Sequence, residues 1–237
     1  MYKKIQHNIV EEHFDNIAAY QCGGNANVAM TARHIGANLF VPSVSVEDTP
    51  AAVKFREASR NFYTQYAIYI RSYLVAKVNG NVDEATSLKQ GFDKFYPTEI
   101  GRIYGNYLSI DDGQRWLSPY QTLTTGIISF IDDISEGKNF NESFAKIKKN
   151  YEEFSTAMSS LLPDWDKRLI DAVWESVVMS LSDQITSRTN KDWASDMVAV
   201  NKLFEILVFG DAQKFSFSEI LARGLIQRNT FRFQPLY

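Results

Sequence analysis

The chain has 237 residues, of which 45% are hydrophobic and 22% are charged, as in an ordinary globular protein and unlike a disordered one. With 25 Lys and Arg against 28 Asp and Glu, the net charge of −3 argues against a nucleic-acid-binding protein, which usually carries a basic surface. A single cysteine, Cys22, excludes an internal disulfide, and three histidines leave little scope for metal or acid–base chemistry.

The N-terminal residues predict no signal peptide, because charged side chains interrupt every apolar run before a core of roughly 7–15 residues can form. Elsewhere the longest apolar runs, such as 126–131, stop far short of the ~20 residues that a membrane-spanning helix needs. We therefore expect no membrane span, and a location in the cytoplasm or inside a virion.

The first fifty residues predict a helix followed by an extended arm. An amphipathic helix over 2–20 is indicated by apolar residues that recur at spacings of about three to four: Ile5, Ile9, Val10, Phe14 and Ile17. Gly23 and Gly24 should end this helix. In residues 21–49, Val44 and Val46 alternate with serine, which is typical of a short strand, although an irregular arm fits the segment equally well.

From residue 48 onward the pattern predicts helices throughout. Thr49 and Pro50 can begin the first, which runs to about residue 77, since a cap oxygen followed by proline favours a helix start. Pro97 and a turn at 111–113 mark the next breaks, and residues 230–237 are expected to be non-helical. The further expected helices are 83–95, 98–108, 113–135, 141–161, 165–188, 191–209 and 217–227.

The fold class predicted from these helices is all-α. Helices of about 20 residues joined by short loops must lie antiparallel, so residues 50–227 predict an up-and-down helical bundle. The first 49 residues and the C-terminal tail, 228–237, flank this body. Because the six or so helices expected over residues 50–210 exceed the needs of one four-helix bundle, two bundles that share a seam remain an alternative.

Several runs resemble, in order, an uncharacterised all-helical family that carries the motifs TR-x-YI, DIG, AG-x-x-L and N-P-x-W. The matching runs are 70–74 (IRSYL), 98–101 (TEIG), 112–116 (DGQRW), 150–158 (NYEEFSTAM), 162–165 (LPDW) and 174–176 (WES). Such proteins occur in bacteria and in large DNA viruses. The resemblance covers about residues 60–210 and implies a helical fold, with no established activity to carry over.

The departures from that family concern histidine. The chain has none after His34, and Tyr66 and Ser176 stand where the family places imidazoles on inner helix faces. Ferritin-like and hemerythrin-like metal sites, which need such histidines, are therefore not expected. Solvated helix faces are the favoured interpretation of the remaining carboxylates, with a divalent-ion or acid/base site as the alternative. These carboxylates are Asp132, Asp133, Glu152, Glu153, Glu175, Asp183 and Asp196.

Three short patterns could carry chemistry, and each has a simpler interpretation. The sequence 111–113 (DDG) lacks the alternating acids of a calcium loop and predicts a turn. Cys22 and His34 match no known arrangement of nucleophile and base. His7 and Glu11 share a helix face that His13 does not, which favours a plain surface helix over a metal site. We expect no catalytic residue and no cofactor.

Arginines among tyrosines, at Arg60, Arg71 and Arg102, could indicate nucleic-acid binding, but the acidic net charge favours ion pairs at helix seams. Arg71 lies one turn from Leu74, so its stem should lie against apolar side chains while its guanidinium meets a carboxylate of another helix. The sequence therefore predicts that Arg71 is an internal ionic anchor.

The two ends of the chain are apolar without a helical period, which is typical of segments that bind a partner. The interaction residues expected there are Phe40, Val41, Val44, Val46, Phe231, Phe233, Leu236 and Tyr237. An equally open alternative is that both ends fold back over the bundle.

Two classes of function remain. The first is a non-enzymatic structural or interaction module that binds a protein partner or self-assembles, for example as a virion component. The second is a helical small-ligand-binding protein or metal-assisted enzyme that uses inner carboxylates and Arg71. A filled interior would favour the first class, whereas a pocket in which Arg71 meets carboxylates would favour the second.

Overall fold

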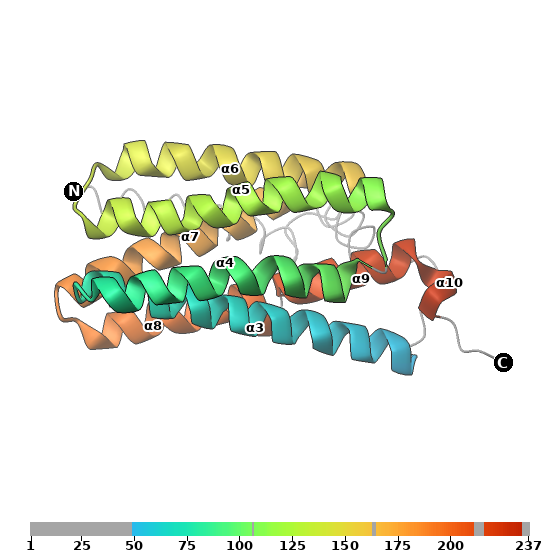
Figure 1. The fold of residues 1–237 in the computed structure, drawn as a ribbon, viewed down its shortest axis with the longest axis horizontal. Helices are drawn as coiled ribbons and strands as arrows, with labels where there is room; N and C mark the ends of the chain where they lie inside the picture. Colours follow the sequence, from blue (N-terminus) through green and yellow to red (C-terminus); the bar gives the residue numbers. More distant parts are fainter. Residues whose placement is uncertain (1–48, 106, 163–164, 211–215, 234–237) are drawn as a thin grey trace, which may run out of the picture.

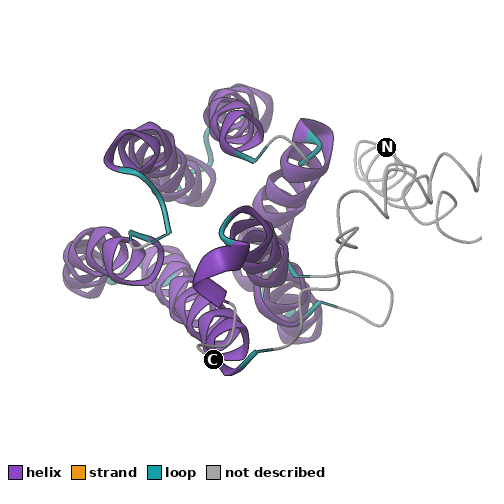
Figure 2. Ribbon diagram, turned by 90° about the vertical axis from the view of Figure 1, so that its right-hand side faces the viewer, coloured by secondary structure: helices purple, strands orange, loops and turns teal. Residues whose placement is uncertain are grey.

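A computed structural model describes residues 49–105, 107–162, 165–210 and 216–233, and the regular structure in these ranges is helical (Figure 1). The long helices lie roughly along one direction in Figure 1, so Figure 2 looks nearly down their axes. The expected all-α, up-and-down bundle is confirmed for these residues. The predicted helix over 2–20 and most of the arm, 21–48, lie outside them.

Short polar side chains begin the helices. The elements are α3 (Pro50–Val78), α4 (Val82–Tyr104), α5 (Ile110–Ser135), α6 (Phe140–Leu161), α7 (Lys167–Thr189), α8 (Trp193–Phe204), the π-helix η1 (Glu205–Phe209), α9 (Phe217–Arg228) and α10 (Thr230–Phe233). From α3 to α9, each α-helix follows a residue whose side chain accepts a hydrogen bond from a backbone N–H of the first turn. These caps are Thr49, Asn81, Ser109, Asn139, Asp166, Asp192 and Ser216.

Helices adjacent in the chain pack as pairs, namely α3 with α4, α5 with α6, and α7 with α8. Contacts of α6 with α7, and of α3 with α9 and η1, join the pairs into one body. The buried side chains form one continuous cluster, so a division into two bundles is not observed among the described residues. At its centre the fully buried Trp174 ring lies 5.2 Å from Phe217, 5.8 Å from Phe154 and 6.4 Å from Tyr66.

The predicted break at Pro97 is wrong, because α4 continues through it to Tyr104. Proline removes one backbone hydrogen bond but need not end a helix whose side chains are held elsewhere. Phe92 and Ile100, on either side of Pro97, are both buried. Packing of the two halves on the same core therefore outweighs the local cost.

The expected turn at 111–113 is also wrong, since these residues form the first turn of α5. The Ser109 hydroxyl accepts a hydrogen bond from the backbone N–H of Asp112 at 3.1 Å. Two carboxylates in a first turn are favoured by the helix dipole. The acidic pair that resembles a turn is thus a helix start.

The tail is helical over Thr230–Phe233, contrary to the prediction. Phe233 is buried, and its ring stacks on Tyr107 at 5.0 Å and lies 5.5 Å from Phe55. Burying one aromatic ring stabilises a fold by a few kcal/mol, roughly 2–3, which accounts for the tail folding back. Among the described residues, no helix is long and apolar enough to cross a membrane.

Candidate interaction surface

Helix α8 carries apolar side chains on two neighbouring faces, whose centres lie about 100° apart around the helix axis. Its inner side carries Asp196, Ala199 and Leu203 at helical spacing, and all three are buried. This side packs against α7, α3 and η1. A helix with a single buried stripe needs no further apolar residues, so the large apolar side chains on the other side require a separate explanation.

The outer side of α8 and η1 carries a row of apolar side chains that we name the α8–η1 stripe: Trp193, Met197, Val200, Phe204 and Phe209. The first four recur at spacings of four, three and four, which places them on one helix face. Trp193 is 56% exposed, Met197 54% and Phe209 68%, whereas Val200 and Phe204 are half-buried and Phe204 also packs against the core. Large apolar groups gathered on one exposed face mark an interaction site more often than scattered ones do.

The π-helix keeps the last aromatic residue of this stripe in line. An α-helix would place residue 208 over Phe204, whereas the wider π turn, with its i to i+5 bonds, brings Phe209 there instead. The two rings stack 6.1 Å apart at an angle of 20°. The turn ends at Gly210, whose φ of 66° favours glycine, and whose N–H donates to the Glu205 carbonyl.

Beneath the stripe, three charged side chains fix α8 to its neighbours. The Asp196 carboxylate, whose side chain is 3% exposed, accepts from Arg71 of α3 at 2.5 Å and from Arg188 of α7 at 2.8 Å through the same oxygen, Oδ2. Arg71 also donates to the Gln184 amide oxygen at 3.0 Å. The structure thus pairs Arg71 with a carboxylate of another helix, as the anchor prediction requires.

A second set of bonds holds the backbone of α8. The Ala199 carbonyl accepts from the Ser180 hydroxyl at 2.6 Å and from the Gln184 amide at 3.4 Å. On the outer side, the Arg188 guanidinium lies 5.3 Å from the centre of the Trp193 ring, a cation–π distance. The ion pairs, the amide bonds and this contact together set the rotation of α8 about its axis, and therefore the direction of the stripe.

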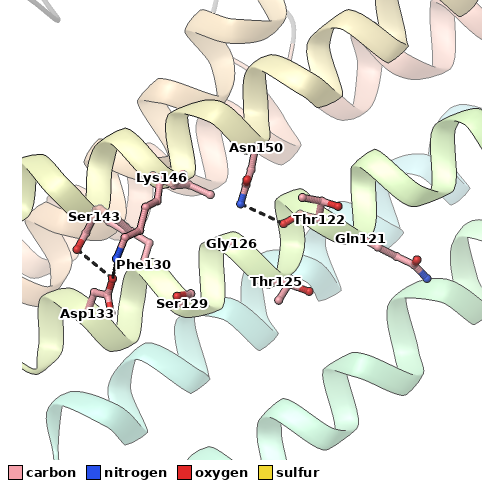
Figure 3. A pocket seen from close by; sticks show the side chains of 11 residues that line it. Gln121, Thr122, Thr125, Gly126, Ser129, Phe130, Asp133, Ser143, Lys146 and Asn150 are labelled. Atoms are coloured by element: carbon pink, nitrogen blue, oxygen red, sulfur yellow. Dashed lines mark hydrogen bonds and ion pairs between the residues drawn. The ribbon is translucent and has the colours of Figure 1, made fainter.

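A groove of about 480 Å³ lies elsewhere, along the outer side of α5 and α6 (Figure 3). The Asn150 amide points across it and donates to the Thr122 carbonyl at 3.4 Å. The helices approach closely here, since a Cβ added at Gly126 would collide with the Asn150 amide nitrogen. Arg71 is not among the residues that line this groove.

The acidic side chain that lines the groove, Asp133, is paired with two lysines. Asp133 accepts from Lys138 at 2.8 Å and from the Ser143 hydroxyl at 3.1 Å, and Lys146 lies 3.6 Å away. The hydrogen bond from Lys138 is the main reason why the pKa of Asp133 is lowered. Figure 3 shows Ser143 and Lys146 both turned toward this carboxylate. The arrangement resembles a link between the two helices more than a set of groups directed at a ligand.

The candidate carboxylates are dispersed through the described parts of the bundle. Asp132 accepts from the Tyr73 hydroxyl at 2.7 Å and pairs with Lys77 at 2.9 Å, whereas Asp196 belongs to the cluster beneath α8. Glu152 lies 3.7 Å from Lys148 on the same helix. No group of three or more potential metal-ligating side chains occurs among the residues that the structure describes.

Of the interaction residues predicted at the two chain ends, Phe231 and Phe233 lie within the described ranges. Phe231 is exposed and its interaction role stays a prediction, whereas the prediction for Phe233 is wrong because its ring is part of the core. The other expected interaction residues lie outside the described ranges: Phe40, Val41, Val44, Val46, Leu236 and Tyr237.

The α8–η1 stripe is not among the surfaces predicted from the sequence, although the spacing of its apolar residues indicates it. The pattern predicts one helix over 191–209, yet the apolar residues there follow two separate courses, one through Ala199, Leu203 and Leu207 and the other through Met197 and Phe204. Two apolar faces on one helix indicate two packing partners. A search of family models, curated proteins and solved structures found no match to this chain.

Proposed function

We propose that this protein is a non-enzymatic interaction module that contributes to a larger protein assembly, such as a virion, through the α8–η1 stripe. The observation that carries the proposal is the exposure of Trp193, Met197 and Phe209 on one face of a helix that is already anchored on its other side. Rigid aromatic anchors on a fixed element are typical of energetically important contact residues.

The proposed partner is a protein rather than a nucleic acid. The stripe is apolar, and the nearest guanidinium, that of Arg188, is already paired with Asp196 and lies against Trp193. Phosphate recognition would need cations directed outward. Helix-in-groove and helix-on-helix contacts, in contrast, depend on apolar residues at spacings of three and four.

The cluster of Arg71, Asp196 and Arg188 serves the proposed function by holding α8 in place. The ligand-binding alternative uses the same arginine, but Arg71 directs both of its terminal nitrogens to protein partners, Asp196 and Gln184. Its guanidinium is therefore a structural group.

Site-specific cross-linking tests the proposed surface. A photo-reactive amino acid at Met197 should form adducts with another protein chain, whether a partner or a second copy, when the full chain is expressed in its native host. Lys149, which is exposed on α6, is the control position. The proposal predicts interchain adducts from position 197 and none from position 149. Equal yields at both positions, or none from position 197, would contradict it.

A further inference from the structure

We infer that residues 2–20 of this chain dock along the α8–η1 stripe and compete there with the protein partner. The inference rests on the proposed function, because it names a regulator of the same surface. Its starting point is that the stripe is apolar and exposed, and that 48 residues of the chain precede the described body.

The sequence of residues 2–20 is that of an amphipathic helix. In a helix over residues 2–20, at about 100° per residue, the apolar side chains of the segment fall on one half of the circumference. The large ones are Ile5, Ile9, Val10, Phe14 and Ile17, and the same half also carries the polar side chains of Lys3, Gln6, His13 and Asn16. Lys4, Glu11, Glu12 and Asp15 fall on the other half. Such a helix can bury its apolar half only by packing on another apolar face.

A helix of residues 2–20 would match the stripe in length. The twelve residues of α8 and the five of η1 give a stripe about 25 Å long, and a helix of residues 2–20 would be about 28 Å long at roughly 1.5 Å per residue. The two apolar faces therefore match in length as well as in chemistry, which is the geometry of a helix that packs along another helix.

The linker is long enough to bring residues 2–20 to the stripe. Residues 21–49 join the segment to α3, and a flexible chain of about 29 residues has a mean span of ~30 Å and a maximum of ~95 Å. Helix α3 itself has 29 residues and is therefore ~44 Å long. Because η1 packs against α3, the stripe lies within the range of this tether.

Tethering also explains why a weak contact is sufficient. A segment joined by a flexible linker of this kind is present at an effective concentration on the order of 1 mM. If the untethered segment bound the stripe with a dissociation constant of about 1 mM, the tethered segment would occupy about half of the stripes. An external partner would then have to displace the segment. The segment thus sets a threshold for assembly.

Cross-linking from the segment distinguishes the possible occupants. A photo-reactive amino acid replaces Phe14 on the apolar half or, as a control, Glu11 on the polar half, in the full-length chain. Equal amounts of unlabelled and ¹⁵N-labelled protein are mixed before irradiation. We expect adducts between position 14 and peptides of 193–209, each within one isotope class, and no such adducts from position 11. Mixed-isotope adducts would assign the stripe to a second copy, and adducts elsewhere or none would equally overturn the inference.

Fluorescence gives an independent measurement. Of the four tryptophans, Trp116, Trp165 and Trp174 are buried, so a soluble quencher such as acrylamide mainly reports on Trp193. Ile9→Glu with Phe14→Glu should increase the quenching, whereas Asn8→Glu with Ala19→Glu, on the polar half, should leave it unchanged. Equal quenching in the wild type and in the first variant would contradict docking.

The failure of this inference can be told apart from failure of the proposed function. If position 14 cross-links within the chain but position 197 forms no interchain adducts, the segment docks and the proposed function fails. If position 197 forms site-specific interchain adducts and position 14 does not reach 193–209, the function stands and the regulatory segment is rejected.

Discussion

Replacement of Arg71 by alanine should lower the free energy of unfolding by about 3 kcal/mol or more. The guanidinium, 16% exposed, lies 2.5 Å from the buried Asp196 carboxylate, so its removal leaves one of the two cations that face this charge. Breaking a buried pair is costly because the remaining group keeps its desolvation penalty. For a chain of this size, the melting temperature should fall by about 6–12 °C.

A matched surface pair provides the control for this variant. Arg102 lies 2.6 Å from Glu99 on α4, but its side chain is 64% exposed. Because solvent screens such a pair, Arg102→Ala should cost less than about 1 kcal/mol. Denaturant titration of both variants measures the difference. An unchanged melting temperature for Arg71→Ala would show that Arg71 does not anchor α8.

Raising the pH above about 10 should unfold the protein cooperatively, because its core contains tyrosines that must stay neutral. Burial is the main cause that raises the pKa of Tyr63, Tyr66, Tyr104 and Tyr120 above the usual value of 10.0. For Tyr96, which is less deeply placed, burial raises the pKa to about 12.

The direction of the pH effect follows from proton binding. Above pH 10 the unfolded chain loses tyrosine protons that the folded chain retains, so stability is complete below this pH and declines as the pH rises. Each fully buried tyrosine contributes a slope of about 1.4 kcal/mol per pH unit. The slope for several such residues is steep.

Absorbance of tyrosinate and far-UV circular dichroism, followed together through the alkaline range, test this expectation. We expect the buried tyrosines to ionise only as the helical signal is lost. In guanidinium chloride, all twelve tyrosines should titrate together near pH 10. Complete ionisation of the native protein with its helices intact would contradict the buried tyrosine core.

Helix positions can be predicted from the sequence because the signals are local. Thr49 with Pro50, and the aromatic spacing that includes Phe62, Tyr66 and Tyr73, define α3 almost to the residue. Pro97 misleads the prediction because the energy that keeps α4 continuous comes from distant rings. Phe233 is misplaced for the same reason, as its stacking partner, Tyr107, is remote in the sequence.

The candidate surface can be predicted only in part. The apolar neighbours of Arg71 in the sequence predict that it pairs with a carboxylate. Its partner, Asp196, is 125 positions away, and the sequence does not distinguish it from the other acidic residues. The outer apolar face of α8 is visible in the spacing of Met197 and Phe204. The identity of the outer face becomes clear only once Leu203 and Ala199 are found against the bundle.

The most direct test of the α8–η1 stripe compares two matched double variants of the full chain. Met197→Glu with Phe209→Glu places charges on the stripe, and Val82→Glu with Ile110→Glu places them at exposed apolar positions elsewhere. Sedimentation velocity measures the assembled species, either the self-associated chain or its complex with the cross-linked partner, while circular dichroism verifies folding. We predict that the first variant loses assembly and the second retains it. Retention of assembly by the first variant, with its helices intact, would contradict the proposed function.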